Sequence, residues 1–248
     1  MTDRLALRLQ AFVRLSAEDR SAVERLVRAA PVRQVQARCD IVREGDRPRA
    51  VILLLDGWAS RCKTLPDGRR QVVALLVPGD LCDVDVFLLE EMDHYIGALT
   101  AVRIAEIGRD EIEGLARDRP GIDRALRRDA LLTTSIQREW TLNVGQRGAY
   151  ERIAHLLAEL FFRLRAVGLA DGPGFAFPLT QTDIAEATAL TPVHVNRTLQ
   201  ELRRDGLIRL DRRTLAIPSL DRLADVAMFN PAYLHLGRED RHLHPNGV

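Results

Sequence analysis

The stretch LTQTDIAEATALTPVHVNRTLQELRRDGLIRL, residues 179–210, decides the fold of the C-terminal part of this chain. Two helical segments, Thr180–Ala187 and Thr191–Arg204, are separated by three residues, which leaves room only for a tight turn. The apolar runs Leu207–Leu210 and Leu215–Ile217 then flank a polar tip and predict a β-hairpin. Two helices at a sharp angle followed by a hairpin are typical of a winged helix-turn-helix, which binds DNA.

The second helix of this unit carries the residue types that recognise base edges. Thr191 is placed to cap it, and Pro192 suits its first turn. Arginine can bind guanine in a bidentate manner and asparagine can bind adenine, so Arg197 and Asn196 are the main candidates. Threonines at the start of the first helix could donate to a phosphate. The residues expected to contact DNA are Thr180, Thr182, Thr191, Pro192, Val193, His194, Asn196 and Arg197.

The N-terminal part has the sequence pattern of a β protein. After an opening helical segment that Pro31 ends, short β-prone runs are cut by turn residues about every ten positions. Pro66-Asp67-Gly68 is the clearest hairpin tip among them. This spacing, with no long helix between the strands, predicts an antiparallel jelly-roll sandwich. The β-prone runs are Val32–Val35, Ile41–Val42, Val51–Leu55, Val72–Val77 and Leu99–Ile107.

One long helix is expected to join the two parts, over Ile122–Gly145. A helix of ~25 residues reaches nearly 40 Å, more than a small sandwich can cover, so we expect its apolar stripe to pair with a second chain. The alternative, a helix that lies on its own domain, stays open because Thr133 and Gln137 interrupt a strict heptad. The predicted class is therefore α+β. Its parts are a jelly-roll sensor over 1–120, a dimerisation helix over 121–148, a winged helix-turn-helix over 149–223 and a tail over 224–248.

Composition narrows the class of protein further. With 36 basic against 35 acidic residues the formal charge is only +1, so any surface for nucleic acid must be local. Three cysteines at unrelated spacings favour a thiol-reduced, cytoplasmic protein, and they give no structural zinc site. No apolar run approaches the ~20 residues of a membrane span, and no signal peptide is apparent.

Taken together, these segments resemble the Crp/Fnr superfamily of bacterial transcription regulators, over about Ala17–Leu223. The resemblance implies a homodimer paired through the long helix and a cyclic-nucleotide-binding-like sandwich that acts as a sensor. It also implies binding to an inverted repeat in double-stranded promoter DNA, with RNA polymerase as a further partner. The motifs that carry it, besides the helix-turn-helix, are Ile41-Val42-Arg43-Glu44-Gly45-Asp46, Leu54-Leu55-Asp56-Gly57, Pro66-Asp67-Gly68-Arg69, Pro78-Gly79-Asp80 and Ala105-Glu106-Ile107.

The chain departs from the family where members that bind cyclic AMP hold it. In those members a Gly-Glu pair holds the ribose and an Arg-Ser pair holds the phosphate. Here Asp83-Val84 stands where the first pair should lie, and the segment Val86–Leu99 contains no arginine or lysine. A phosphate among carboxylates without a guanidinium is strongly disfavoured. We therefore do not expect cyclic AMP to bind in the family's usual manner.

The other sensors of this family are not expected either. The first cysteine is Cys39, so the N-terminal cysteine cluster of an iron–sulfur centre is missing. Haem or metal ligation through Cys82 or His94 has little support, and no metal site is assigned. The effector stays unknown, and a small-molecule effector stays open. The residues considered for an effector pocket are Cys82, Asp83, Val84, Asp85, His94, Gln137 and Arg138.

Two other functions compete with DNA binding. Jelly rolls can house metals and the chain has six histidines, but these are isolated, except for His242-Leu243-His244 in the expected tail. Neither a two-histidine–carboxylate site nor a nucleophile triad emerges, so we do not expect an enzyme. A small-molecule- or metal-binding jelly-roll protein without a direct DNA role remains the alternative, although it leaves Thr180–Ile217 unexplained.

Overall fold

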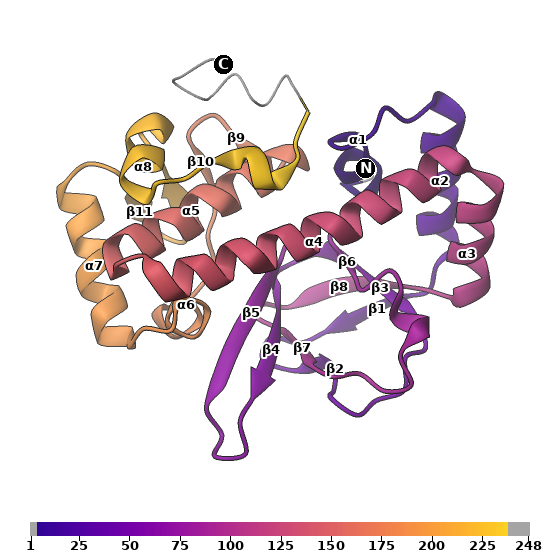
Figure 1. The fold of residues 1–248 in the computed structure, drawn as a ribbon, viewed down its shortest axis with the longest axis horizontal. Coiled ribbons are helices and arrows are strands. Elements are labelled where there is room, and N and C mark those ends of the chain that lie inside the picture. The colour runs from indigo at the N-terminus through magenta and orange to yellow at the C-terminus, as the bar shows by residue number, and fades with distance from the viewer. Residues whose placement is uncertain (1–3, 238–248) are drawn as a thin grey trace.

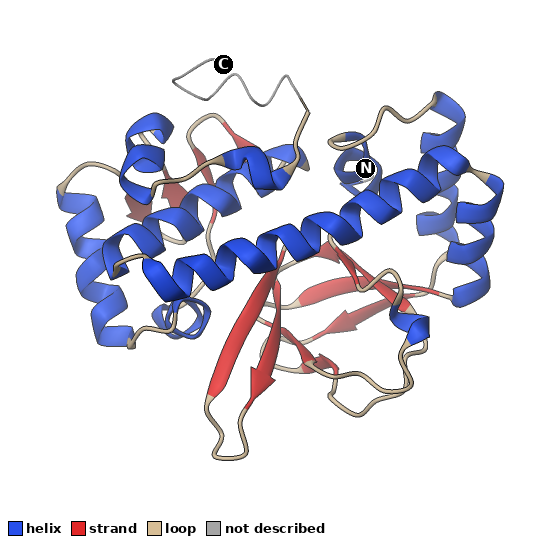
Figure 2. Ribbon diagram, in the orientation of Figure 1, coloured by secondary structure: helices blue, strands red, loops and turns tan. Residues whose placement is uncertain are grey.

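The computed structural model describes residues 4–237, and it has the expected α+β architecture (Figure 1). An N-terminal sandwich and a C-terminal helical domain lie along one long helix, α4, which passes both of them (Figure 2). Within the described part of the chain, residues 32–107 form two four-stranded antiparallel sheets, with strand orders β1-β8-β3-β6 and β2-β7-β4-β5. The expected jelly-roll sandwich is thereby confirmed.

Five strands of the sandwich overlap the β-prone runs of the sequence, whereas β4, β6 and β7 lie outside them. Strands β4 and β5 form the hairpin whose tip is Pro66-Asp67-Gly68, as expected. A second turn, at Gly79, precedes β6. The strands are β1 (Val32–Val35), β2 (Asp40–Val42), β3 (Val51–Asp56), β4 (Ala59–Thr64), β5 (Arg70–Leu76), β6 (Leu81–Cys82), β7 (Tyr95–Ala98) and β8 (Val102–Ile107); a short 3-10 helix, η1, spans Val86–Leu88.

Strand β3 is apolar without alternation because both of its faces are covered. Ile52 and Leu54 belong to the core between the two sheets. Val51 and Leu53 belong to a second core, where helices pack on the outer face of the sheet. Leu9 of α1 is fully buried in that second core. The helices that build it are α1 (Arg4–Gln10), α2 (Ala17–Ala29) and α3 (Arg109–Asp118).

The long helix α4 spans Pro120–Gln146, close to the expected bounds. Part of its apolar stripe packs on its own chain, which was the alternative to pairing with a second chain. This part is covered because α1 and the C-terminal domain extend along the helix beyond the sandwich (Figure 1). Leu131 and Leu142 stay exposed, so pairing of α4 with a second chain stays a prediction. The residues of α4 buried in this way are Ile122, Ala125, Leu126, Asp129, Leu132, Ser135, Ile136, Trp140 and Asn143.

The C-terminal domain contains the winged helix-turn-helix and two elements that the sequence analysis missed. Residues 168–178, for which no strand was predicted, contain β9 (Ala170–Asp171) and β10 (Gly174–Ala176), which extend the hairpin into a sheet of order β11-β12-β10-β9. These strands are too short to show a period of two residues. The other elements are α5 (Ala149–Ala166), α6 (Gln181–Thr188), α7 (Pro192–Arg204), β11 (Arg209–Asp211) and β12 (Thr214–Ala216).

The expected tail is also partly structured. Helix α8 (Leu220–Ala227) and a 3-10 helix, η2 (Pro231–Leu234), occupy residues 220–234. Phe229 and Leu234 are buried in the core because they pack beside α5. His242 and His244, which also belong to that tail, lie outside the described residues.

A single hydrophobic core runs from the sandwich into the C-terminal domain. Trp58 in the turn between β3 and β4 meets Phe177, which precedes α6, edge to face at 6.4 Å between ring centroids. Val72 and Leu75 of β5 belong to the same cluster as Ile184 of α6. The two parts are therefore packed together as well as joined by α4. No helix among residues 4–237 is both long enough and apolar enough to cross a bilayer.

We predict that Gly57→Ala destabilises the protein far more than Gly68→Ala. Both glycines have a left-handed backbone (φ +80° and +87°), so alanine at either costs roughly 1–2 kcal/mol. A Cβ at Gly57 would also collide with the backbone oxygen of Ala101 and lie 2.8 Å from Thr100 Oγ1, whereas a Cβ at Gly68 has nothing within 4 Å. We expect a further loss of about 2 kcal/mol at Gly57 in urea denaturation. Equal losses at the two sites would contradict this packing.

Candidate nucleic-acid interface

The first helix of the helix-turn-helix, α6, is fixed at both ends. The Thr180 hydroxyl accepts from the Asp183 amide at 3.2 Å, and Asp183 Oδ2 accepts from the Thr180 amide at 2.8 Å. This reciprocal pair is a capping box that satisfies the free amides of the first turn. Ala189 ends the helix in a left-handed conformation (φ +53°), which produces the sharp turn before α7.

The second helix, α7, has one buried and one outward face. Thr191 accepts from the His194 amide at 3.2 Å, and Pro192 occupies the first turn, as the sequence predicts. Val195, Thr198, Leu199 and Leu202 are buried at a spacing of three to four residues. On the outward face the side chain of Val193 is 80% exposed. Contact with water does not stabilise this apolar side chain.

The structure places the eight residues predicted to contact DNA on the accessible side of this unit. Val193, Asn196 and Arg197 are exposed on α7, and His194 is half-buried beside them. Gln200 Nε2 donates to Asn196 Oδ1 at 3.4 Å, so the two amide side chains are neighbours on that face. The four residues at the helix starts, Thr180, Thr182, Thr191 and Pro192, are exposed as well.

The tip of the hairpin carries two arginines. Asp211 and Thr214 are paired across β11 and β12, so Arg212 and Arg213 form a two-residue turn. Both have positive φ, +43° and +67°, which is the pattern of a type I′ turn. That turn favours asparagine and glycine, so both arginines adopt a backbone conformation that is unfavourable for their side chains. An unfavourable backbone of this kind is typical of functional positions.

Side chains of the sandwich contact α6, whereas the outward face of α7 stays exposed. Arg38 Nη2 donates to Asp183 Oδ2 at 3.0 Å, and Gln71 Nε2 donates to the Glu186 carbonyl at 2.6 Å. Arg70 lies 3.7 Å from the Glu186 carboxylate. Burial alone would raise the pKa of Asp183, but hydrogen bonds from Arg38 and Thr180 outweigh burial and lower it. The orientation of the helix-turn-helix is therefore set by a charged contact from the sensor side.

Asp83, which stands where family members carry a ribose-holding residue, belongs to a charged cluster. Arg61 of β4 donates to Asp83 Oδ1 at 2.7 Å and to His94 Nε2 at 3.2 Å, and His94 Nδ1 lies 2.6 Å from Asp93 Oδ1. Burial alone would raise the pKa of Asp83, but His94 and Arg61 outweigh it and lower that pKa. This guanidinium was not predicted, because Arg61 lies on a strand outside Val86–Leu99.

The structure does not bring the seven effector-pocket candidates into one pocket. Cys82 and Asp83 line a cleft of about 700 Å³ at the edge of the two sheets, whereas Val84 and Asp85 line a separate cleft of about 170 Å³ beside η1. Burial raises the pKa of the Cys82 thiol well above its ordinary value, which makes it an inert side chain.

The remaining candidates serve structural contacts. Gln137 of α4 donates to the Val73 carbonyl at 2.7 Å, and Arg138 donates to Ser135 Oγ at 3.0 Å. His94 is buried in the Arg61 cluster. Among the residues that the structure describes, no three His, Cys, Asp or Glu side chains are grouped so as to hold a metal ion.

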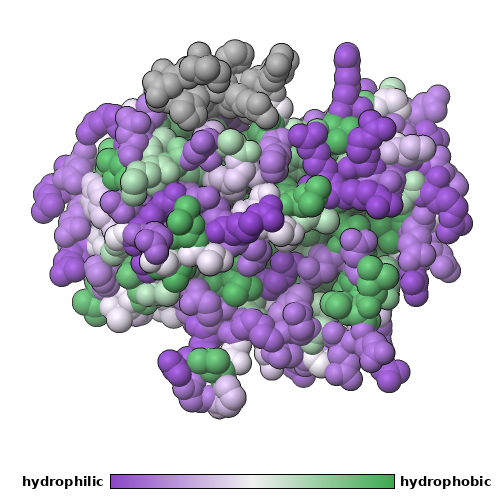
Figure 3. Space-filling model, viewed as in Figure 1, coloured by the Kyte–Doolittle hydropathy of each residue, from purple (hydrophilic) through white to green (hydrophobic). Residues whose placement is uncertain are grey.

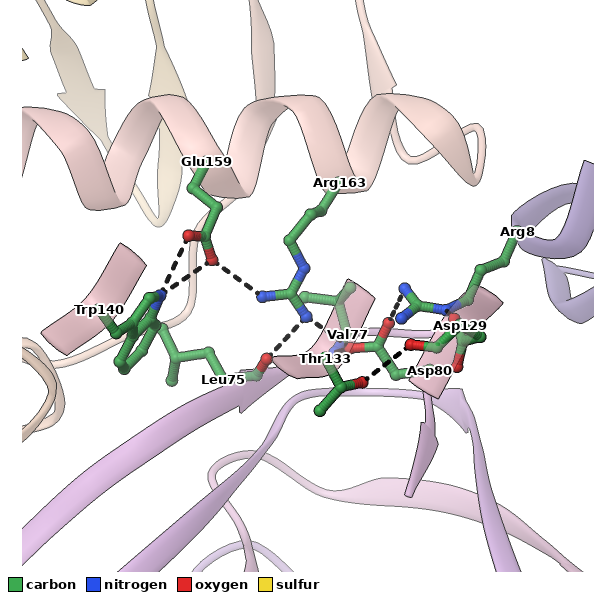
Figure 4. A network of polar contacts seen from close by, with 9 residues as sticks. All are labelled: Arg8, Leu75, Val77, Asp80, Asp129, Thr133, Trp140, Glu159 and Arg163. Carbon is green, nitrogen blue, oxygen red and sulfur yellow. Dashed lines mark hydrogen bonds and ion pairs between the residues drawn. The ribbon is translucent and has the colours of Figure 1, made fainter. Parts of the chain in front are cut away.

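A buried polar network connects the sandwich, α4 and the C-terminal domain (Figure 4). Asp80, in the turn between β5 and β6, pairs through Oδ1 with Arg8 of α1 and accepts through Oδ2 from Arg163 of α5 at 2.7 Å. Arg8 Nε also donates to Asp129 of α4 at 2.6 Å. Burial raises the pKa of Asp129 despite the Arg8 charge.

The same network continues along α5. Arg163 Nη1 donates to Glu159 Oε1 at 3.2 Å, and Glu159 also accepts from the Trp140 indole at 3.0 Å and from the Tyr233 hydroxyl at 2.8 Å. Glu159 is fully buried, so its charge depends on these partners. Apart from Glu159 and Arg163, which are four positions apart on α5, the network does not follow from sequence spacing, since its other members lie up to 121 positions apart.

Comparison with known proteins agrees with this geometry. A cyclic nucleotide-binding domain family matches residues 32–119, and a Crp-like helix-turn-helix family matches residues 151–226. The chain is 30% identical over 192 residues to a probable transcriptional activator of Rhizobium leguminosarum bv. viciae, covering 77% of this chain and 79% of the relative. It is 31% identical over 199 residues to the transcriptional activator protein FnrL of Cereibacter sphaeroides, covering 79% of each.

Solved structures share the fold. The structure of FixK2 from Bradyrhizobium japonicum superimposes with a TM-score of 0.71 at 24% identity, over 80% of this chain and 97% of that one.

We predict that Arg38→Gln raises the pKa of Asp183 toward its ordinary value of 3.8. Since the folded-state pKa lies below that value, Asp183 stabilises the folded state at neutral pH, and this contribution is lost as pH falls through the folded pKa. The variant should therefore lose less stability on acidification than the parent. Carboxyl NMR titration of Asp183 measures the shift. Arg43→Gln, which removes an exposed partner of Asp40, is the control. An unchanged Asp183 titration in Arg38→Gln would refute the contact.

Proposed function

This chain belongs to the Crp/Fnr family of DNA-binding transcription regulators, and on that premise we propose that it binds an inverted repeat in promoter DNA as a homodimer. The family consists of regulators rather than enzymes. The observation that carries the proposal is the outward face of α7, where Val193, Asn196 and Arg197 are exposed on a helix whose other face is buried. Both named relatives are activators, which supports activation and RNA polymerase as a further partner.

Residues in the N-terminal half of α7 would form the hydrogen bonds with base edges. Arg197 has the reach and the paired donors for guanine O6 and N7, and Asn196 suits adenine N6 and N7. Thr180 and Thr182 at the start of α6 are positioned as phosphate donors. Arg212 and Arg213 at the hairpin tip supply attraction to the backbone that weakens with salt.

The homodimer rests on the face of α4 that this chain leaves uncovered. Leu131 is 62% exposed and Leu142 is 47% exposed, eleven positions apart and so about three helical turns. Figure 3 shows hydrophobic side chains in small groups on the face that α4 crosses, between hydrophilic ones. A parallel pair of α4 helices would bury both leucines and relate two α7 helices by a twofold axis, about 34 Å apart. The exposed positions of α4 at three- and four-residue spacing are Arg124, Arg127, Leu131, Thr134, Arg138 and Thr141.

The sandwich does not suit cyclic AMP in the family's usual manner. A cyclic phosphate would need the Arg61 guanidinium, but that group is held by Asp83 and His94 in a buried cluster. The ligand would also meet the Asp83 and Asp93 carboxylates, which have lowered pKa values and therefore stay ionised at neutral pH. Like charges at this range repel the ligand. An effector of this sandwich would therefore be a different molecule or would bind at a different site.

The experiment that tests the function is selection of bound fragments from a genomic library, followed by gel retardation of the enriched sequences. We expect an inverted repeat with half-sites one helical turn apart, and an affinity that falls steeply with salt concentration. Retardation without sequence preference, or none at all, would contradict the proposal.

Arg197→Ala should weaken binding to the selected operator about 5- to 150-fold, because one bidentate base contact contributes about 1–3 kcal/mol. Binding to a scrambled duplex should change little, and the dimer should persist. Fluorescence anisotropy with both duplexes measures the ratio. Arg25→Ala, an exposed arginine of α2, is the matched control. If Arg197→Ala keeps its discrimination between the duplexes, Arg197 does not read a base.

Leu131→Glu should convert the dimer into a monomer, because it places two carboxylates at the centre of the paired α4 helices. Sedimentation velocity measures the change, and operator affinity should fall with it. Leu88→Glu is the control, since Leu88 is 79% exposed on η1, outside α4. A Leu131→Glu protein that remains dimeric would refute pairing through this face.

A further inference from the structure

A cleft of about 540 Å³ lies on the outer face of the sandwich, away from the site that a cyclic nucleotide would occupy. Leu53 and Leu55 of β3 and Val32 of β1 line it, and Val32 is 51% exposed. Its other walls are α1 and α2, which cover this face of the sheet only in part (Figure 1). The cleft therefore combines an apolar sheet surface with two helical walls.

The charges around the cleft are unbalanced. Four arginines line it against one carboxylate, that of Glu24. Arg4 donates to the Leu55 carbonyl at 3.4 Å. No carboxylate of residues 4–237 forms an ion pair with the other three, which are Arg20, Arg28 and Arg103.

Arginines elsewhere on the same sandwich show the contrast. Arg33 pairs with Glu106 at 2.9 Å, and Arg61 pairs with Asp83 at 2.7 Å. Grouping unpaired guanidiniums in a concave surface concentrates a positive potential, which attracts anions from solution. The chain as a whole has a formal charge of only +1, so this excess is a local property of the cleft.

We propose that this cleft binds a phosphorylated organic anion of about nucleotide size. The volume lies within the range of ~300–1,000 Å³ typical of small-molecule sites. Guanidinium groups match phosphate oxygens with paired donors, so Arg20, Arg28 and Arg103 would hold the phosphates. A planar or apolar body would then lie on Leu53 and Leu55. This site does not depend on DNA binding by α7.

The cleft is connected to the buried network that reaches the C-terminal domain. Gly79 lines the cleft, and its neighbour Asp80 accepts from Arg8 and Arg163. An added Cβ at Gly79 would lie 3.1 Å from the Arg4 backbone oxygen and 3.2 Å from Val167, so α1, this turn and the end of α5 are in close contact. Arg4 and Arg8 are one helical turn apart on α1. A ligand in the cleft therefore lies where the sandwich contacts α5. Binding there would change how the sandwich packs against α5.

The test is titration of the full-length protein with the fluorescent nucleotide mant-ADP, with unlabelled ADP as competitor. We expect one saturable site per chain, displaced by ADP and displaced less well by pyrophosphate, which lacks the planar body. Arg20→Ala/Arg28→Ala should weaken binding at least tenfold, because both arginines are exposed and their loss leaves the fold intact.

The matched control is Arg14→Ala/Arg25→Ala, which removes two exposed arginines of the same region that do not line the cleft. Its affinity should stay within twofold of the parent. Absence of saturation at millimolar mant-ADP would overturn the proposal, as would an equal loss in both double variants. Loss of binding in Arg212→Ala/Arg213→Ala would place the nucleotide on the hairpin and would overturn it too.

Discussion

The arrangement of this protein depends on one buried carboxylate, Asp80. Its two oxygens are shared between Arg8 of α1 and Arg163 of α5, and Arg8 also holds Asp129 of α4 (Figure 4). All four groups are almost fully buried, so each charge is stable only while its partners stay in place. Removing one partner of such a network typically costs about 3–5 kcal/mol. The sandwich, the long helix and the C-terminal domain are therefore held in one relative position by a contact that tolerates little displacement.

This constraint explains how a sensor and a DNA-reading unit work in one chain. The network fixes α5, and the contact of Arg38 with Asp183 fixes α6, while the outward face of α7 stays free. A small change at the turn that carries Asp80 would be transmitted to α5 as a rigid shift, because packed interiors do not deform gradually. In a dimer paired through α4, that shift would alter the distance between the two α7 helices.

Much of this fold could be predicted from the sequence, because local signals agree with the final structure. The caps at Thr180 and Thr191 and the turn residues between the strands are local features, and they placed the helix-turn-helix and the sandwich. The contact of Arg61 with Asp83 could not be predicted, because the sheet register joins residues from separate strands. The covering of α4 by its own chain was also out of reach, since it depends on how the domains pack. The apolar Phe229 was a signal for the structured tail, whereas β9 and β10 are too short to show a strand period.

The central claim is that two copies of α7, related by a twofold axis, read promoter DNA. It is tested most directly by a crystal structure of the full-length protein on its selected operator. We predict α4 paired with α4, one α7 in each of two successive major grooves, and Arg197 within hydrogen-bonding distance of a base edge. A complex in which α7 faces away from the duplex, or in which a single chain occupies the operator, would contradict the account.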